Sequence, residues 1–143
     1  MKISIKNRAK LELASLAHNT LMTTLGITID EIGDDYLIGS MPVTAAVVQP
    51  ARILHGGASV ALAETLGSIA SYFLVDPKTH YCVGLEINAN HIRSVKENEG
   101  KVIGKAIPLH IGRKTHVWEV KITNEQGKLV CISRLTVAVL EKE

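Results

Sequence analysis

The sequence has little net charge, few cysteines and no segment typical of an export signal. Its formal net charge of +2 over 143 residues is too small to indicate a nucleic-acid-binding protein. Its 2 cysteines are too few for a metal site and are expected to be reduced thiols in apolar stretches. The N-terminal segment MKISIKNRAK carries charges but no apolar run, so no secretion signal is expected. These absences together favour a cytoplasmic protein.

Linkers, internal repeats, glycine-rich phosphate loops and metal-ligating clusters are also missing from the sequence. His110 and His116 lie close in sequence, but no carboxylate or cysteine is arranged around them, so no metal site is predicted. With 46% hydrophobic and 21% charged residues, the composition is that of an ordinary globular protein. Residues 1–143 are therefore predicted to form one domain with a single core.

One carboxylate stands in an otherwise apolar segment. From Gly57 to Val75 the chain reads GASVALAETLGSIASYFLV, and Glu64 is the only charged residue in it. A helix that is apolar all round is a buried helix, and the serines and Glu64 argue against a membrane span. Because an ionised carboxylate is costly to bury without partners, Glu64 indicates a functional site.

The remaining patterns predict a helix, a hairpin and a run of strands. Apolar spacing predicts an amphipathic helix over residues 9–25. Alternation and turn residues predict strands over 27–32, 36–43, 81–92, 101–111, 115–123 and 128–140, with a loop over 44–56 before the long helix. This order predicts an α+β fold in which an antiparallel sheet wraps around one buried helix. Since one sheet covers only part of an apolar helix, a second subunit is expected over the rest.

Three segments carry a family resemblance: QPARILHGGASVALAETLGSIAS, VGLEINANHIRSV and PLHIGRKTHVWEV. Together they resemble the hotdog-fold acyl-CoA thioesterases, and most closely those acting on 1,4-dihydroxy-2-naphthoyl-CoA and other aroyl-CoA substrates in menaquinone and siderophore pathways. The resemblance implies the hotdog fold and an acyl-CoA substrate. It also implies paired subunits with sites at their interface, as a homodimer or as a homotetramer built from two dimers. No separate cofactor is implied, because coenzyme A is part of the substrate.

The candidate catalytic residues are those that thioester hydrolysis needs. The free N–H of Gly56 at the helix start would polarise the carbonyl, and Glu64 would act as nucleophile or general base. Ser68, one turn later, could hydrogen-bond that carboxylate or the attacking water. Gln49 could orient the carbonyl or the water, and His55 could support the departing thiolate. The structural alternatives are a chain turn at Gly56, a packing role for Ser68, an ordinary loop role for Gln49 and a loop-holding role for His55.

The spacing of Gly56 and Glu64 indicates a site shared between subunits. Eight residues of helix span about 12 Å, whereas both groups must lie within roughly 7–8 Å of each other to act on one carbonyl. We therefore expect Glu64 to act on a substrate held by Gly56 of the partner subunit.

The resemblance also implies a set of residues at the bound substrate, with the basic ones near the coenzyme A phosphates: Gly84, Asn90, His91, Arg93, Ser94, Gly112, Arg113 and Lys114. The alternative for the basic residues is a solvated edge-strand face. Two other functions remain open. One is a broad medium-chain or phenylacetyl-CoA thioesterase, and the other is a non-catalytic acyl-CoA sensor, against which Glu64 and Ser68 argue.

Overall fold

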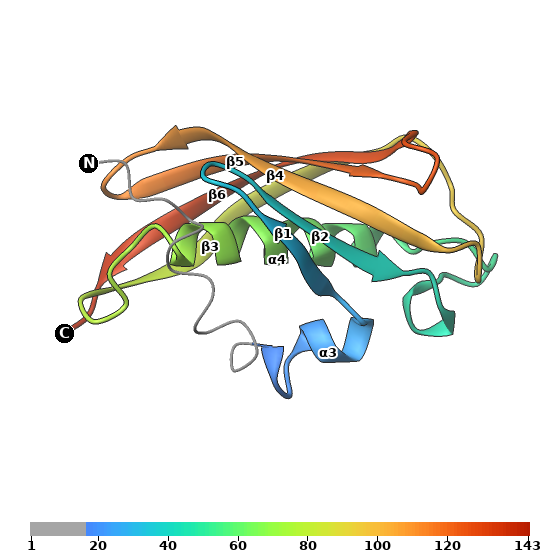
Figure 1. Ribbon diagram of the computed structural model, residues 1–143, viewed down its shortest axis with the longest axis horizontal. Coiled ribbons are helices and arrows are strands. Elements are labelled where there is room, and N and C mark those ends of the chain that lie inside the picture. Colours follow the sequence, from blue (N-terminus) through green and yellow to red (C-terminus); the bar gives the residue numbers. More distant parts are fainter. Residues whose placement is uncertain (1–16) are drawn as a thin grey trace.

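In the computed structural model, which describes residues 17–143, one long helix lies across an antiparallel sheet (Figure 1). The described elements are α3 (Leu21–Leu25), β1 (Thr28–Ile32), β2 (Leu37–Pro42), the 3-10 helix η2 (Ala45–Val47), α4 (Gly56–Tyr72), β3 (His80–His91), β4 (Lys101–Ile111), β5 (Thr115–Thr123) and β6 (Leu129–Glu141). The strand order is β1-β2-β4-β5-β6-β3, and every neighbouring pair is antiparallel. The predicted α+β architecture is confirmed.

The predicted strands are confirmed to within one or two residues, and those over 101–111 and 115–123 coincide with β4 and β5. The long helix runs from Gly56 to Tyr72 rather than from 57 to 75. The helix predicted over 9–25 is confirmed at its C-terminal end, where Leu21–Leu25 form α3, but it is not continuous, because residues 18–20 are not helical. Asn19 has a left-handed φ of 54° and Thr20 is extended, which interrupts any helix at that point. Residues 9–16 of that prediction lie outside the described residues.

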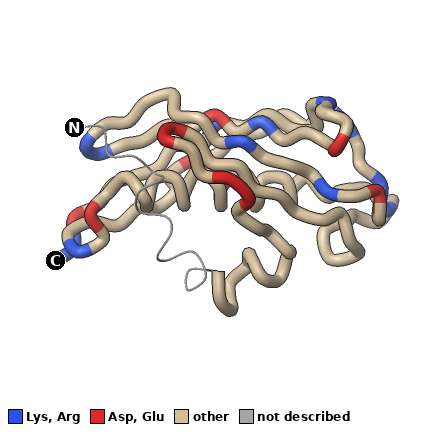
Figure 2. The backbone as a smooth tube through the Cα atoms, viewed as in Figure 1, with Lys and Arg blue, Asp and Glu red and all other residues tan. Residues whose placement is uncertain are grey.

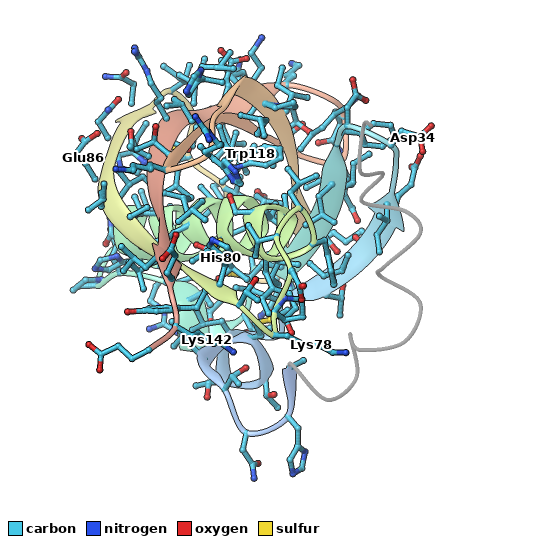
Figure 3. The ribbon with its side chains drawn as sticks, turned by 90° about the vertical axis from the view of Figure 1, so that its left-hand side faces the viewer. Asp34, Lys78, His80, Glu86, Trp118 and Lys142 are labelled. Carbon is cyan, nitrogen blue, oxygen red and sulfur yellow. The ribbon has the colours of Figure 1, made fainter. Side chains whose placement is uncertain are left out.

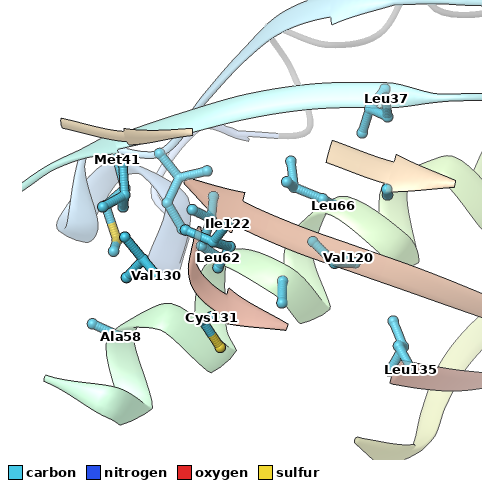
Figure 4. Close-up of a cluster of buried hydrophobic side chains, with 14 of the residues drawn as sticks. Leu37, Met41, Ala58, Leu62, Leu66, Val120, Ile122, Val130, Cys131 and Leu135 are labelled. Carbon is cyan, nitrogen blue, oxygen red and sulfur yellow. The ribbon is translucent and has the colours of Figure 1, made fainter. Parts of the chain in front are cut away.

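The core lies between α4 and the sheet. Leu62 and Leu66 of α4 pack among buried residues of β5 and β6, among them Ile122 and Leu135 (Figure 4). Trp118 is fully buried between α4 and the sheet (Figure 3). Burial of one such large apolar side chain stabilises the fold by about 1.5–3 kcal/mol.

Close approach of helix and sheet depends on small residues on α4. A Cβ at Gly67 would lie 2.6 Å from Leu135 Cδ2, so glycine is what lets β6 contact the helix here. Ala63, Ala70 and Ser71 on the same side are fully buried. These small residues therefore lie on the side of α4 that faces the sheet.

The opposite side of α4 is not buried within one chain. The positions that recur every three or four residues on this side, namely Gly57, Ala61, Glu64, Thr65, Ser68 and Tyr72, are half-buried or exposed. The described residues of one chain therefore cover only part of the helix, as expected for a single sheet, and Glu64 is half-buried where the sequence led us to expect a buried acid. The physical reason is that a single sheet covers only one side of a helix. We call this set of positions the open stripe of α4.

Strand β3 is an edge strand of the sheet, and a bulge halfway along it changes which alternate residues face α4. Among the described residues it pairs only with β6, and its register shifts between Gly84 and Glu86. Before the shift Gly84 faces α4, and after it Ile87 and Ala89 pack against the core. Such a bulge restores the inward phase of a strand that would otherwise turn its polar residues onto the helix. Figure 3 accordingly shows Glu86 pointing away from α4.

No helix within residues 17–143 has both the length and the apolar character needed to cross a membrane.

Candidate active site

The start of α4 leaves one backbone donor without a partner. His55 precedes the helix in an extended conformation, and its Nδ1 accepts a hydrogen bond from the Gly57 N–H at 2.8 Å. Its carbonyl accepts bonds from the N–H groups of Ala58 and Ser59 at 3.0 and 3.2 Å. Of the four N–H groups that a helix start leaves free, only that of Gly56 has no partner in the described part of the chain. It is therefore available to a ligand carbonyl.

Gly56 is in contact with His91, at the end of β3. A Cβ at Gly56 would lie 2.9 Å from His91 Nε2 and 3.0 Å from Cε1, so only a glycine allows the ring to approach this closely. Within one chain, His91 therefore lies beside the free Gly56 amide. Two of the residues expected at the substrate are thus brought together at the start of α4.

In the loop before α4, the side-chain oxygen of Gln49 is held by a backbone hydrogen bond. Gln49 Oε1 accepts a hydrogen bond from the Ala51 N–H, and the Gln49 N–H donates to the Ile53 carbonyl at 2.9 Å. The side-chain NH₂ remains as the group that can donate to a ligand. The loop itself is fixed by Arg52, whose Nε and one terminal nitrogen each lie 2.7 Å from a Glu97 oxygen. This ion pair lowers the pKa of the Glu97 carboxyl, and the sequence analysis did not identify it.

The Glu64 carboxylate lies on the open stripe of α4, together with Ser68. No hydrogen bond or ion pair joins Glu64 to another residue in the range 17–143, and none joins Glu64 to Ser68. On the sheet it lies close to Gly84, where a Cβ would overlap Glu64 Oε1. The carboxylate is thus unpaired, half-open and at the edge of the sheet, as required of a group that acts on a ligand.

Lys and Arg residues lie along the strands and at both ends of the sheet (Figure 2). Those expected at the substrate fall into two groups at opposite ends. The Arg93 N–H donates to the Val130 carbonyl at one end of β6, and the Lys114 carbonyl accepts from the Val139 N–H near the other. Nine residues of strand separate Val130 from Val139, or about 30 Å. Asn90, His91, Arg93 and Ser94 are therefore remote from Gly112, Arg113 and Lys114 within one chain. Alternation along β3 also places Asn90 on the face opposite to His91.

Two cavities lie near these residues. The larger, of about 1150 Å³, is at the Arg113 end and includes His80 and Lys114 in its lining. The smaller, of about 320 Å³, lies beside His55 and is lined otherwise by apolar or glycine positions: Leu21, Leu25, Ala46, Val47, Val48, Gly57, Ala58 and Ala61. This apolar pocket could not be predicted from the sequence, because its walls come mainly from three separate elements, α3, η2 and α4. Residues 17–143 contain no cluster that could hold a metal ion.

Comparison with known proteins identifies the family. The family model described as "Thioesterase superfamily" matches residues 51–131. The chain is 46% identical over 136 residues to the 1,4-dihydroxy-2-naphthoyl-CoA hydrolase of Escherichia coli, covering 94% of this chain and 98% of the relative.

Solved structures agree with the family match. A glutamine-to-alanine variant of thioesterase PA1618 from Pseudomonas aeruginosa is 46% identical, with a TM-score of 0.88 over 92% of this chain and 93% of that one. Thioesterase HI1161 from Haemophilus influenzae is 42% identical, with a TM-score of 0.86 over 94% of each chain. The chain thus belongs to the thioesterase superfamily, has the hotdog fold of that family, and is a thioester hydrolase.

Proposed function

We propose that the protein hydrolyses aromatic acyl-CoA thioesters, 1,4-dihydroxy-2-naphthoyl-CoA or a closely similar compound. The observation that carries the proposal is the unpaired Glu64 carboxylate on the open stripe of a helix whose start presents one free amide, that of Gly56. The identity of 46% to the E. coli hydrolase supports the naphthoyl group and, with it, a place in menaquinone formation.

The proposed chemistry assigns one task to each group. The Gly56 N–H donates to the thioester carbonyl and stabilises the negative charge that develops on its oxygen, an effect typically worth about 10²–10³ in rate. Glu64 either attacks the carbonyl carbon or takes a proton from a water that attacks it. In the first route the C–S bond breaks as an anhydride forms between the acyl group and Glu64, and water then hydrolyses this anhydride; in the second route water attacks the carbonyl directly and the C–S bond breaks. In both routes coenzyme A leaves as a thiolate that is then protonated, and the acyl group ends as a carboxylic acid. Ser68, Gln49 and His55 orient the water, the carbonyl and the leaving group.

A pair of subunits completes this site. Glu64 lies against Gly84, and Gly56 lies against His91, on the same edge strand. If two copies pair along β3 with Gly84 opposite the partner's His91 and the bulge residue unpaired in each strand, Asn88 lies opposite the partner's Asn88, on the symmetry axis. Residues directly opposite in an antiparallel pair point to the same face, so this register points Glu64 toward the partner's Gly56. The apolar residues exposed on or beside this edge, Tyr81, Val83, Leu85 and Ile92, support such a pairing.

The same register reunites the two basic groups. It sets the partner's Arg93 opposite Cys82, which is paired through β6 with Val139 and so lies near Lys114. The partner's Arg93 is then three strand spacings of about 5 Å from Lys114, or about 15 Å, which is half the separation of Arg93 and Lys114 within one chain. Long basic side chains can then contact the phosphates of one coenzyme A from both subunits. Assembly of two such dimers into a tetramer and a cytoplasmic location remain predictions.

The small pocket beside His55 is the proposed place of the acyl group. Its lining is apolar except for His55, and its volume of about 320 Å³ accommodates an aromatic ring system. A broad medium-chain thioesterase is the second candidate, because an apolar lining also accepts an alkyl chain. Acyl preference therefore separates the two.

The test is thiol release over a panel of aroyl- and alkyl-CoA substrates, with wild type and Glu64→Gln. We expect the highest kcat/KM for the naphthoyl thioester, and a loss of more than about a hundredfold in Glu64→Gln with an unchanged unfolding midpoint. A folded Glu64→Gln variant that keeps more than about a tenth of the activity, a loss below about 1.4 kcal/mol, would remove Glu64 from catalysis. Higher kcat/KM for alkyl substrates would favour the broad enzyme, and binding without turnover would favour the sensor.

A further inference from the structure

Gly84 occupies the position on β3 that faces the end of the Glu64 side chain. A Cβ at Gly84 would overlap Glu64 Oε1 and lie 3.4 Å from Glu64 Cδ, whereas the next residue, Leu135, is 3.7 Å away through Cδ1. The volume that any side chain at this position would fill is therefore occupied by the carboxylate. Gly84 is not among the glycines with positive φ, so its backbone conformation suits any residue. The contact with Glu64, and not the backbone, accounts for glycine here.

The position of the Glu64 carboxylate depends on this contact. In the described part of the chain, no hydrogen bond or ion pair holds the carboxylate, so packing alone determines where it lies. The bulge between Gly84 and Glu86 turns the Gly84 Cα toward α4 without turning Ile87 away from the core. The bulge and the missing side chain together create room for the carboxylate at the edge strand.

We infer that Gly84 is a positioning residue that keeps the Glu64 carboxylate at the edge of the sheet, facing the substrate. The inference rests on the proposed role of Glu64 as the catalytic carboxylate. It gives Gly84 a role through Glu64 instead of a direct contact with the substrate.

A methyl group at position 84 should act on activity and not on stability. The overlapping atom is the far end of a flexible side chain, so Glu64 can rotate away while the strand stays in place. Replacing a strand glycine by alanine also reduces the entropy lost on folding. A displacement of about 1 Å of a reacting group can nevertheless cost about a hundredfold in rate.

The experiment compares Gly84→Ala with wild type in thiol release and in urea unfolding. We expect kcat to fall by at least about tenfold, KM to change by less than about twofold, and the unfolding midpoint to be unchanged or higher. The matched control is Gly104→Ala, whose new Cβ would lie 2.6 Å from Leu66 Cδ1 in the core. It should lower the midpoint without the selective loss in kcat.

A double-mutant cycle with Glu64→Asp tests the contact itself. Shortening the acid by one methylene makes room for the new methyl group. The loss of kcat caused by Glu64→Asp should therefore be at least about tenfold smaller in the Gly84→Ala background than in wild type, a coupling of about 1.4 kcal/mol. Glu64→Asp combined with Gly104→Ala should be additive.

Three results would overturn the inference: full activity of Gly84→Ala, additivity in the cycle with Glu64→Asp, or loss of cooperative unfolding in Gly84→Ala. An active Glu64→Gln would instead overturn the proposed role of Glu64 and the inference with it. An inactive Glu64→Gln beside a fully active Gly84→Ala would leave the proposed function standing and refute only the role of Gly84.

Discussion

Two inactive variants should restore activity when they meet in one dimer. In the proposed site the carboxylate comes from one subunit and the free amide from the other. Glu64→Ala removes the carboxylate from one chain. Gly56→Val blocks the amide in the other, since even a Cβ at Gly56 lies 2.9 Å from His91 Nε2 and a branched side chain must displace that ring. Because His91 and Gly56 belong to the same half of the site, the disturbance stays in that half.

The expected recovery follows from counting sites. Equal mixing of the two variants makes about half of the dimers mixed, and each mixed dimer has one site with an intact Gly56 and an intact Glu64. Activity should therefore return to about a quarter of the wild-type value in the mixture, and to about half in mixed dimers purified through two different tags. Each variant refolded alone should stay inactive in the same thiol-release assay.

A reciprocal mixture provides the control. A chain carrying both Gly56→Val and Glu64→Ala is paired with wild type, and the mixed dimers are purified. If sites are shared, both sites of such a dimer lack one group and the dimer is inactive. If each site lies within one chain, the wild-type subunit keeps its site and about half of the activity remains. Active reciprocal dimers, together with inactive dimers of the two single variants, would refute the shared site.

Two further predictions concern the acyl pocket and a buried histidine. Ala46→Phe should lower kcat/KM for aroyl-CoA by at least about tenfold, because Ala46 lines the small pocket, whereas its exposed neighbour Ala45 does not and Ala45→Phe should leave it unchanged. Burial lowers the pKa of His116 below 6.5, with the Gly112 carbonyl opposing and His110 adding to the effect. The unfolded state therefore binds more protons below about pH 6.5. The free energy of unfolding, measured with urea, should decrease as the pH is lowered through this range, and it should decrease less steeply in His116→Asn.

The fold could be predicted from the sequence because its signals are local. Alternation in strands such as 101–111 and 115–123, and the apolar run after Gly57, match the elements almost residue by residue. The prediction of one continuous helix up to residue 25 missed the interruption at residues 18–20, because leucine spacing does not indicate the left-handed backbone at Asn19. A periodic pattern indicates which residues are buried, but it does not indicate where a single backbone angle interrupts a helix or strand.

The candidate site was predictable only in part, because its residues come from separate elements. The composition of α4 was enough to select Glu64, since no other charge occurs there. The contacts of Gly84 with Glu64 and of His91 with Gly56 depend on the bulge in β3, which no residue type marks. The acyl pocket likewise depends on how α3 packs over the loop before α4.

Two features of the single chain support the proposed pairing of subunits. The open stripe of α4 and the free edge of β3 adjoin each other along the Glu64–Gly84 contact, so one covering body must account for both. A thioester is too short for this, because the 12 residues of β3 extend for about 40 Å. A second copy fits, since it brings an edge of the same length, apolar residues such as Val83 and Ile92 to face each other, and the free amide that Glu64 lacks in its own chain. In the proposed dimer, subunit pairing and completion of the catalytic site are the same event, so a variant that separates the subunits should lose activity while each chain remains folded.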